Sequence, residues 1–131
     1  MTRVVRERLT PSFLVIAAAA LVASPATSAK DGDVLVRGTC SGVSSSKLKL
    51  SRENAGIEVE FEVDQNRNGV RWTIVLSRPT RVLFRGTRVT RAPSGSVELR
   101  RVVANTTGPD RIQARATRSS GEVCRATATM G

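Results

Sequence analysis

The sequence predicts an all-β protein, an antiparallel immunoglobulin-like β-sandwich of seven or eight strands, with a small β-barrel as the alternative. Apolar and polar residues alternate with a period of two in one segment after another, the pattern of half-buried strands. These segments recur at spacings of roughly 10–13 residues and are divided by turns rich in Gly, Pro and Asn. After the N-terminal segment, no stretch has the periodicity of a helix.

The N-terminus has the features of a secretory signal peptide. Three arginines stand in the first nine residues, residues 13–23 carry no charge, and small residues fill 24–29. A membrane-spanning helix needs ~20 apolar residues, so this segment is too short to be one. We therefore expect residues 1–29 to be a signal peptide cleaved after Ala29, with cleavage after Ser28 as the alternative. Residues 30–131 then form a single secreted, extracellular domain with no membrane span after cleavage.

Composition excludes several classes of chemistry. The chain has 131 residues, no His and two Cys, and 21 Lys+Arg against 11 Asp+Glu give a net charge of +10. Without His there is no Ser-His-Asp or Cys-His catalytic set and no His-ligated metal. Two cysteines cannot form an all-cysteine zinc site. We expect no enzymatic activity and no cofactor.

The two cysteines, Cys40 and Cys124, predict one structural disulfide. Export places them in an oxidising compartment, and CxxC spacing, which would indicate a reactive pair, is absent. The bridge would close a loop of about 84 residues and stabilise the fold by roughly 4–5 kcal/mol in the chain-entropy model. Both cysteines have the strand parity of neighbouring apolar residues and can face the same core.

The first half of the domain predicts a hairpin. Residues 34–40 open the fold, and 47–50 and 57–64 alternate strictly around a turn at 51–56. Lys47 and Lys49 are then expected opposite the acidic positions of the second strand, which are Glu58, Glu60 and Glu62. The other interpretation of these three residues, a carboxylate trio for catalysis or metal binding, is disfavoured because this pairing already explains them.

The second half continues the strand pattern. Residues 71–76 place Trp72 on the core face, and 81–85 are expected to point Val82 and Phe84 inward. Gly86 is interpreted as a bulge before a short strand at 87–90. The alternation of the strand that starts at Val97 slips at residues 100–103, and the last two strands cover 112–116 and 122–128 around a turn at 119–121.

Three motifs resemble functional signatures but predict ordinary structure. Residues 64–69 match the first half of an EF-hand loop, yet Val75 occupies the position of its bidentate Glu, so a hairpin turn on the Asn-Gly pair is favoured. Ser44 and Lys47 have the spacing of a Ser/Lys dyad, but Lys47 begins a strand rather than a helix. Asn105-Thr106-Thr107 is a glycosylation sequon, meaningful only in a eukaryotic secretory pathway.

Arginine supplies the one unusual feature of the composition. Six arginines stand at outward strand parity: Arg71, Arg81, Arg85, Arg111, Arg115 and Arg125. If their strands adjoin, they form a guanidinium-rich sheet face suited to phosphate and carboxylate groups. The external partners that such a face suits are an anionic wall polymer, an acidic polysaccharide, an anionic lipid surface or nucleic acid. Nucleic acid is the less attractive of these, because export separates the protein from it and base-stacking aromatics are nearly absent. The plainer interpretation is an evenly distributed charge that keeps the protein soluble.

Residues 38–128 resemble a group of small secreted actinobacterial proteins of unknown function. The resembling segments are 47–50, 57–64, 84–88, 92–96, 108–110 and 121–124. The resemblance implies secretion and a disulfide-closed β-sandwich, and it implies no activity. The enediyne-carrier apoproteins are also secreted immunoglobulin-like domains of about this size, but they carry two disulfides, and they are similar in fold only.

Together these features predict a secreted, non-enzymatic binding module, with an anionic cell-envelope polymer as the most concrete partner. One alternative is a carrier that holds a small apolar ligand between the sheets, which requires a dry pocket near Trp72. The other is a module or inhibitor that binds an extracellular protein, which requires an ordered, protruding loop such as 91–96 or 105–110.

Overall fold

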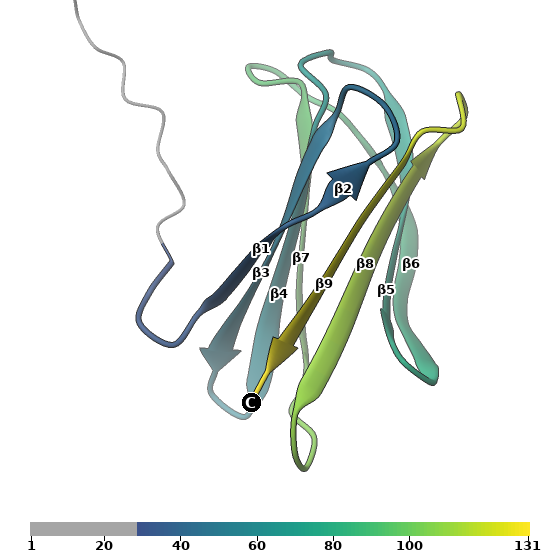
Figure 1. Ribbon diagram of the computed structural model, residues 1–131. Coiled ribbons are helices and arrows are strands. Elements are labelled where there is room, and N and C mark those ends of the chain that lie inside the picture. Colours follow the sequence, from purple (N-terminus) through teal and green to yellow (C-terminus); the bar gives the residue numbers. More distant parts are fainter. Residues whose placement is uncertain (1–28) are drawn as a thin grey trace, which may run out of the picture.

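The computed structural model describes residues 29–131, which form two antiparallel sheets packed face to face (Figure 1). One sheet has four strands in the order β1 (Val34–Arg37), β3 (Ser45–Glu53), β4 (Gly56–Asp64) and β7 (Ser96–Ala104). The other has five, in the order β2 (Thr39–Cys40), β9 (Val123–Met130), β8 (Asp110–Arg118), β5 (Arg71–Arg78) and β6 (Arg81–Val89).

The predicted fold class, an all-β sandwich with one disulfide, is confirmed. The described residues form two open sheets rather than a closed barrel. They contain nine strands instead of seven or eight, because the opening segment divides into β1 and β2, which join different sheets. The predicted signal peptide, apart from Ala29, lies outside the described residues.

The core lies between the two sheets and is built from their inward-facing residues. Trp72 and Phe61 are its largest fully buried side chains, and the rest are mainly aliphatic. The indole nitrogen of Trp72 donates a hydrogen bond to Gln65 Oε1 at 3.1 Å, so the polar atom of the central aromatic is satisfied. Smaller residues of β8 and β9 complete the packing: Ala114, Ala116, Ala126 and Ala128.

The predicted hairpin between residues 47 and 64 is present as β3 and β4. Their register places Lys47 opposite Glu62 and Lys49 opposite Glu60, as the alternation predicts. The inward residues between them are fully buried, and a shift by one residue would turn that whole set to solvent. Burial of this apolar set therefore fixes the register, and the two cross-strand ion pairs agree with it.

At one edge of the sandwich, the chain crosses from one sheet to the other at Gly38. β1 pairs with β3 in one sheet, and two residues later β2 pairs with β9 in the other. The backbone N–H of Gly38 donates to the carbonyl of Ser46 at 2.9 Å. A Cβ on Gly38 would lie 2.6 Å from the carbonyl oxygen of Arg125 and also overlap the Ser46 hydroxyl. Only glycine fits between the two sheets at this crossing.

Two expectations for residues 81–90 are wrong, because the irregularity in β6 lies at Leu83 and not at Gly86. Phe84 pairs with Leu76, whereas Val82 pairs with Ser77, so Leu83 has no opposite residue. The extra residue reverses the parity beyond it, and Val82 faces outward with 54% of its surface exposed. Gly86 pairs regularly within one continuous strand, and its missing side chain makes room for the ring of Phe84.

The connection from β4 to β5 is not the predicted hairpin turn, because the two strands belong to different sheets. Asn66 and Gly69 adopt positive φ angles of 57° and 78° as the chain crosses. Thr90 anchors this loop: its hydroxyl accepts from Val70 N at 2.9 Å and donates to the Arg67 carbonyl at 2.6 Å. The Asn-Gly pair predicted a turn correctly, but the strand that follows it, β5, pairs with β6 and β8 and not with β4.

The predicted disulfide between Cys40 and Cys124 is confirmed. The two residues stand directly opposite each other on β2 and β9, and Cys124 is fully buried. β2 has only two residues, so the covalent bond holds a short edge strand that few backbone hydrogen bonds secure.

The apparent slip in the alternation of β7 has a structural cause at the open side of the sandwich. Arg101 occupies an inward position opposite Val59, and its guanidinium lies 4.5 Å from the ring centre of Phe84 on β6. Arg88 stacks on the same ring at 5.4 Å. β6 and β7 are the edge strands of their sheets on this side of the sandwich. The guanidinium groups of Arg88 and Arg101 therefore cover the ring of Phe84, which closes the core there.

Candidate anion-binding surface

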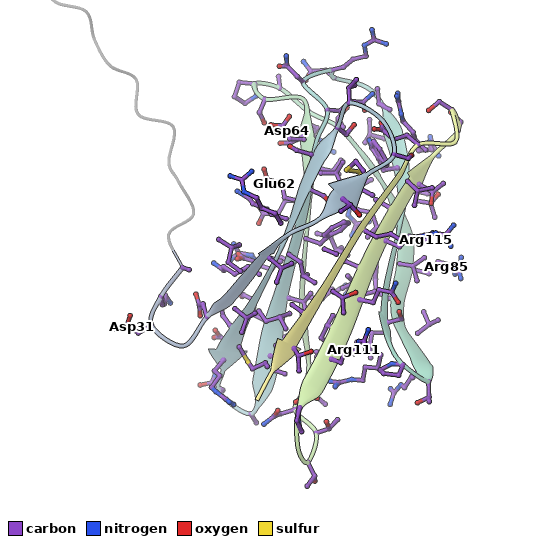
Figure 2. All side chains as sticks on the ribbon, viewed as in Figure 1. Asp31, Glu62, Asp64, Arg85, Arg111 and Arg115 are labelled. Atoms are coloured by element: carbon purple, nitrogen blue, oxygen red, sulfur yellow. A yellow bond between two sulfur atoms is a disulfide. The ribbon has the colours of Figure 1, made fainter. Side chains whose placement is uncertain are left out.

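All six predicted arginines lie on the five-stranded sheet and are exposed. Five of them, Arg71, Arg85, Arg111, Arg115 and Arg125, have the outward parity opposite to the buried residues of their strands. We call the outward side of β9, β8, β5 and β6, which carries these five residues, the basic face. Figure 2 shows Arg85 and Arg115 on the side of the sandwich opposite to Glu62.

Three of the arginines stand in one row across the strands. Arg125 on β9 is opposite Arg115 on β8, which is opposite Val75 on β5, which is opposite Arg85 on β6. We call Arg125, Arg115 and Arg85 the arginine row. Neighbouring strands are separated by ~4.8 Å, so the row extends over roughly 15 Å.

The remaining three predicted residues lie away from the row. Arg111, opposite Thr129, and Arg71, opposite Val89, mark the two ends of the basic face. Arg81 does not belong to it, because the extra residue at Leu83 reverses its parity and places it opposite Arg78. The expected outward parity is therefore wrong for this one residue.

Between the arginines the basic face is lined with hydroxyl and amide side chains, which the sequence analysis did not single out. Thr117, Thr73 and Thr87 form one cross-strand row, and Thr127, Gln113 and Ser77 form another. Their signal was present in the sequence as polar residues at outward parity on the predicted strands. These groups can hydrogen-bond to a polar chain lying on the guanidinium groups.

The basic face contains no acidic residue. Of the carboxylates on the strands of the five-stranded sheet, only Asp110 is present, and it is 2% exposed and ion-paired to Arg78. Glu122, just before β9, is also buried and lies 3.1 Å from Arg118. Within residues 29–131, no carboxylate lies within ion-pair distance of the five outward arginines.

The outer face of the four-stranded sheet is organised differently, because most of its charged residues form ion pairs, although Arg37 stands opposite Lys47 without one. Lys47 lies 3.4 Å from Glu62, and Lys49 lies 2.6 Å from Glu60. Arg100 contacts Glu60 together with Glu58 at 3.9 Å and Glu98 at 3.4 Å. The interaction with Glu60 and then Glu58 raises the pKa of Arg100. The predicted pairing with Lys47 and Lys49 therefore accounts for Glu62 and Glu60, whereas Glu58 stands opposite Ser51 and has Arg100 as its basic partner.

The Ser/Lys spacing and the EF-hand-like segment both have structural roles in the fold. Ser44 lies against the buried Glu122, which accepts from its backbone N–H at 3.1 Å and its hydroxyl at 2.8 Å, so it forms no dyad with Lys47. The EF-hand-like segment is held by an Asx turn in which Asn66 N donates to Asp64 Oδ1 at 3.0 Å. Residues 29–131 hold no group of three or more metal-ligating side chains. They also contain no helix that could span a membrane.

The surroundings of Trp72 do not favour a carrier of small apolar ligands. Trp72 is completely buried among core side chains, and the main depressions on the described surface do not reach it. The depression on the basic face is lined by Ser77, Pro79, Arg111 and Gln113 and is open to solvent. None of these depressions is the dry pocket between the sheets that this alternative requires.

The loop at residues 91–96 meets one condition for a protein-binding module, because it is both exposed and tethered. Arg91 and Ser96 form a bridge, and Gly95 N donates to the Arg91 carbonyl at 2.9 Å. Gln65 N donates to the Gly95 carbonyl at 3.2 Å, which fastens the loop to the β4–β5 connection. Loop 105–110 is anchored at one end, where the Thr106 hydroxyl donates to Asp110 Oδ1 at 2.5 Å.

Comparisons with known proteins add no assignment: no family model, curated protein or solved structure matches this chain significantly.

Proposed function

We propose that this protein is a secreted, non-enzymatic binding module that attaches to an anionic cell-envelope polymer through its basic face. The observation that carries the proposal is the segregation of charge between the two sheets. Glu58, Glu60 and Glu62 of β4 in the four-stranded sheet each form an ion pair with a basic residue, whereas the five arginines of the basic face form none with a carboxylate of residues 29–131. An external polyanion would supply the missing charge.

The shape of the basic face supports an extended ligand rather than a small one. Its guanidinium groups alternate with hydroxyl side chains over four adjoining strands, and the depressions beside Arg111 and Arg125 are open to solvent. Arg forks bind phosphate and carboxylate groups bidentately, and hydroxyls bind sugar or polyol oxygens. A polymer of repeating anionic and polar groups satisfies both kinds of side chain.

An extracellular location is part of this proposal. It is supported by the signal-peptide features of residues 1–29 and by the disulfide, which persists in oxidising compartments. The proposal also agrees with the resemblance to small secreted actinobacterial proteins, which stays a prediction.

The test is the binding of residues 30–131, which contain both sheets and the disulfide, to isolated cell-envelope fractions across a salt series. We expect saturable binding above that of a charge-matched inert protein, weakening as salt rises. Substituting Arg71, Arg85, Arg111 and Arg115 by Ser is expected to abolish most of it.

A matched control removes the same charge elsewhere, by substituting Arg37, Arg52, Arg67 and Arg91 with Ser. These residues lie outside the basic face, so the control should bind nearly as well as the wild type. Equal losses in the two variants, or wild-type binding no better than that of the inert protein, would contradict the proposal.

We expect no catalysis from this chain. Turnover of ester, peptide or glycoside substrates by the purified protein, lost when one of its own serines or carboxylates is substituted, would overturn that expectation.

A second candidate function is the binding of an extracellular protein through loop 91–96. The tethering of this exposed loop by Gln65 and by its own bridge favours it. Capture of an extracellular hydrolase, lost on deletion of residues 92–94 but retained in the Arg-to-Ser variant of the basic face, would support this function over the first.

A further inference from the structure

Two guanidinium groups of the arginine row stand directly opposite each other. Arg115 and Arg125 are register partners on β8 and β9, and both are exposed. Like charges at directly opposite positions destabilise a sheet, and no carboxylate among residues 29–131 relieves this pair. Repulsion between the two guanidinium groups therefore destabilises the free protein, and an anion bound between them would relieve this repulsion.

The positions around the pair are suited to a polar ligand. Gln113 and Thr127 form the next outward pair on one side, and Thr39 on β2 stands opposite Arg125. On the other side the next pair is Thr117 and Val123. Hydrogen-bonding side chains thus lie beside the two guanidinium groups along both the strand and the row.

We propose that Arg115 and Arg125 form a clamp for one phosphate group of the anionic polymer. A carboxylate has two oxygens in one plane, and a single guanidinium fork uses one lone pair on each of them. A tetrahedral phosphate presents oxygens in more than one plane, so two neighbouring forks can approach it together. The inference rests on the proposed function and names the anionic group that the basic face selects.

Arg85 extends this arrangement along the row. It stands two strands beyond Arg115, with Val75 between them, at a separation of roughly 10 Å. A polymer that crosses the strands would place one phosphate in the clamp and a second anionic group at Arg85. The outward apolar side chains of this face are isolated valines, which give no apolar anchor for a lipid bilayer and favour a polymer over a membrane.

The experiment compares the binding of residues 30–131 to poly(glycerol phosphate) and to polygalacturonate of equal charge number, at several salt concentrations. We expect the wild type to prefer the phosphate polymer by roughly tenfold, the effect of losing one charged bidentate contact. Arg115→Lys and Arg125→Lys keep the charge but remove the fork. Each should bring the preference close to one, because affinity for the phosphate polymer should fall by more than affinity for polygalacturonate.

The matched controls are Arg71→Lys and Arg111→Lys, which change the same residue type at the ends of the basic face. They should retain the wild-type preference, and urea unfolding of all four variants shows that the fold is intact. An equal effect of Arg71→Lys and Arg115→Lys would overturn the clamp, because selectivity would then belong to the whole face.

Two further outcomes separate the clamp from the proposed function. Equal wild-type affinity for both polymers would overturn the clamp and leave the binding of anionic polymers in place. Binding to neither polymer above the charge-matched inert protein would overturn both. Tighter binding to phosphatidylglycerol vesicles than to poly(glycerol phosphate) would overturn the assignment of the phosphate to a polymer.

Discussion

Two buried carboxylates tie loops to the opposite ends of β8. Asp110, at the start of the strand, accepts from Thr106 and Arg78, and Arg78 also donates to the Ala104 carbonyl. Glu122, beyond the end of the strand, accepts from Ser44 and is ion-paired to Arg118. These contacts close the β7–β8 loop and the β2–β3 loop over the ends of the core.

The ionisation of both carboxylates couples the stability of the fold to pH. Burial by itself raises the pKa of each, but hydrogen bonds from Thr106 and Arg78 to Asp110, and from Ser44 to Glu122, outweigh it. Both pKa values therefore lie below the ordinary 3.8 and 4.5. A carboxyl whose pKa is lowered by folding stabilises the native state above its unfolded-state pKa, and this contribution is lost as pH falls through the folded-state value.

We predict that the free energy of unfolding in urea is nearly constant from neutral pH down to about 5 and falls steeply below about 4. The double variant Asp110→Asn, Glu122→Gln should be less stable at neutral pH and should lose less stability on acidification. The exposed substitution Glu53→Gln is the control and should keep the wild-type profile. A wild-type profile that is flat down to about pH 2 would contradict this account.

Gly38 provides a second prediction at the scale of a single residue. A methyl group there overlaps the backbone of β9 and the side chain of Ser46, so Gly38→Ala should lower the free energy of unfolding by about 1–3 kcal/mol. The neighbouring exposed substitution Thr39→Ala should change it by less than about 0.5 kcal/mol. Urea unfolding measures both changes. Equal stability of Gly38→Ala and the wild type would contradict the claim that only glycine fits between the two sheets at this position.

At the scale of elements, β6 is an edge strand of nine residues with no partner on its outer side. Val82 and Val89 are exposed on it, at 54% and 40%, which by itself favours pairing with another chain. Arg81, Arg85 and Arg88 are distributed along the same strand. Their repulsion in an edge-to-edge dimer opposes such pairing.

We predict that the triple variant Arg81→Thr, Arg85→Thr, Arg88→Thr self-associates with rising concentration, while the wild type remains a monomer. Sedimentation velocity at low salt measures the difference. The matched control is Arg71→Thr, Arg111→Thr, Arg115→Thr, which removes the same charge from the inner strands of the sheet and should stay monomeric. Association of both variants to the same extent would assign the effect to net charge and not to the edge.

The accuracy of sequence-based prediction also differed from element to element. The β3–β4 hairpin was predictable because strict alternation and opposite charges specify the same register. The parity of Arg81 and Val82 was not, because one unpaired residue at Leu83 reverses it without a distinctive local signal. The Asn-Gly segment identified a turn, but a turn sequence does not say whether the next strand joins the same sheet.

The arginine row illustrates the same limit for the candidate site. Outward parity alone identified Arg85, Arg115 and Arg125 as exposed residues of separate strands. Their alignment depends on the pairing of β5 with β8, strands separated by β6 and β7 along the chain. Such long-range pairing is fixed by packing between whole strands, so a single sequence does not specify it.

For the whole molecule, the distribution of charge distinguishes two faces of one sandwich. The outer face of the four-stranded sheet carries ion pairs across β3, β4 and β7, whereas the basic face carries arginines without acidic partners. The ion pairs neutralise most charges of the first face locally, whereas no carboxylate of residues 29–131 neutralises the five arginines of the second. The proposed polyanionic partner would cover the basic face and account for this asymmetry.

The most direct test of this account is a map of backbone amide chemical shifts in isotope-labelled residues 30–131 titrated with poly(glycerol phosphate). The predicted shifts are confined to β9, β8, β5 and β6 and are largest near Arg125, Arg115 and Arg85. They should disappear at high salt. Shifts centred on the four-stranded sheet or on loop 91–96, or no shifts at low salt, would contradict the claim that the basic face binds the polymer.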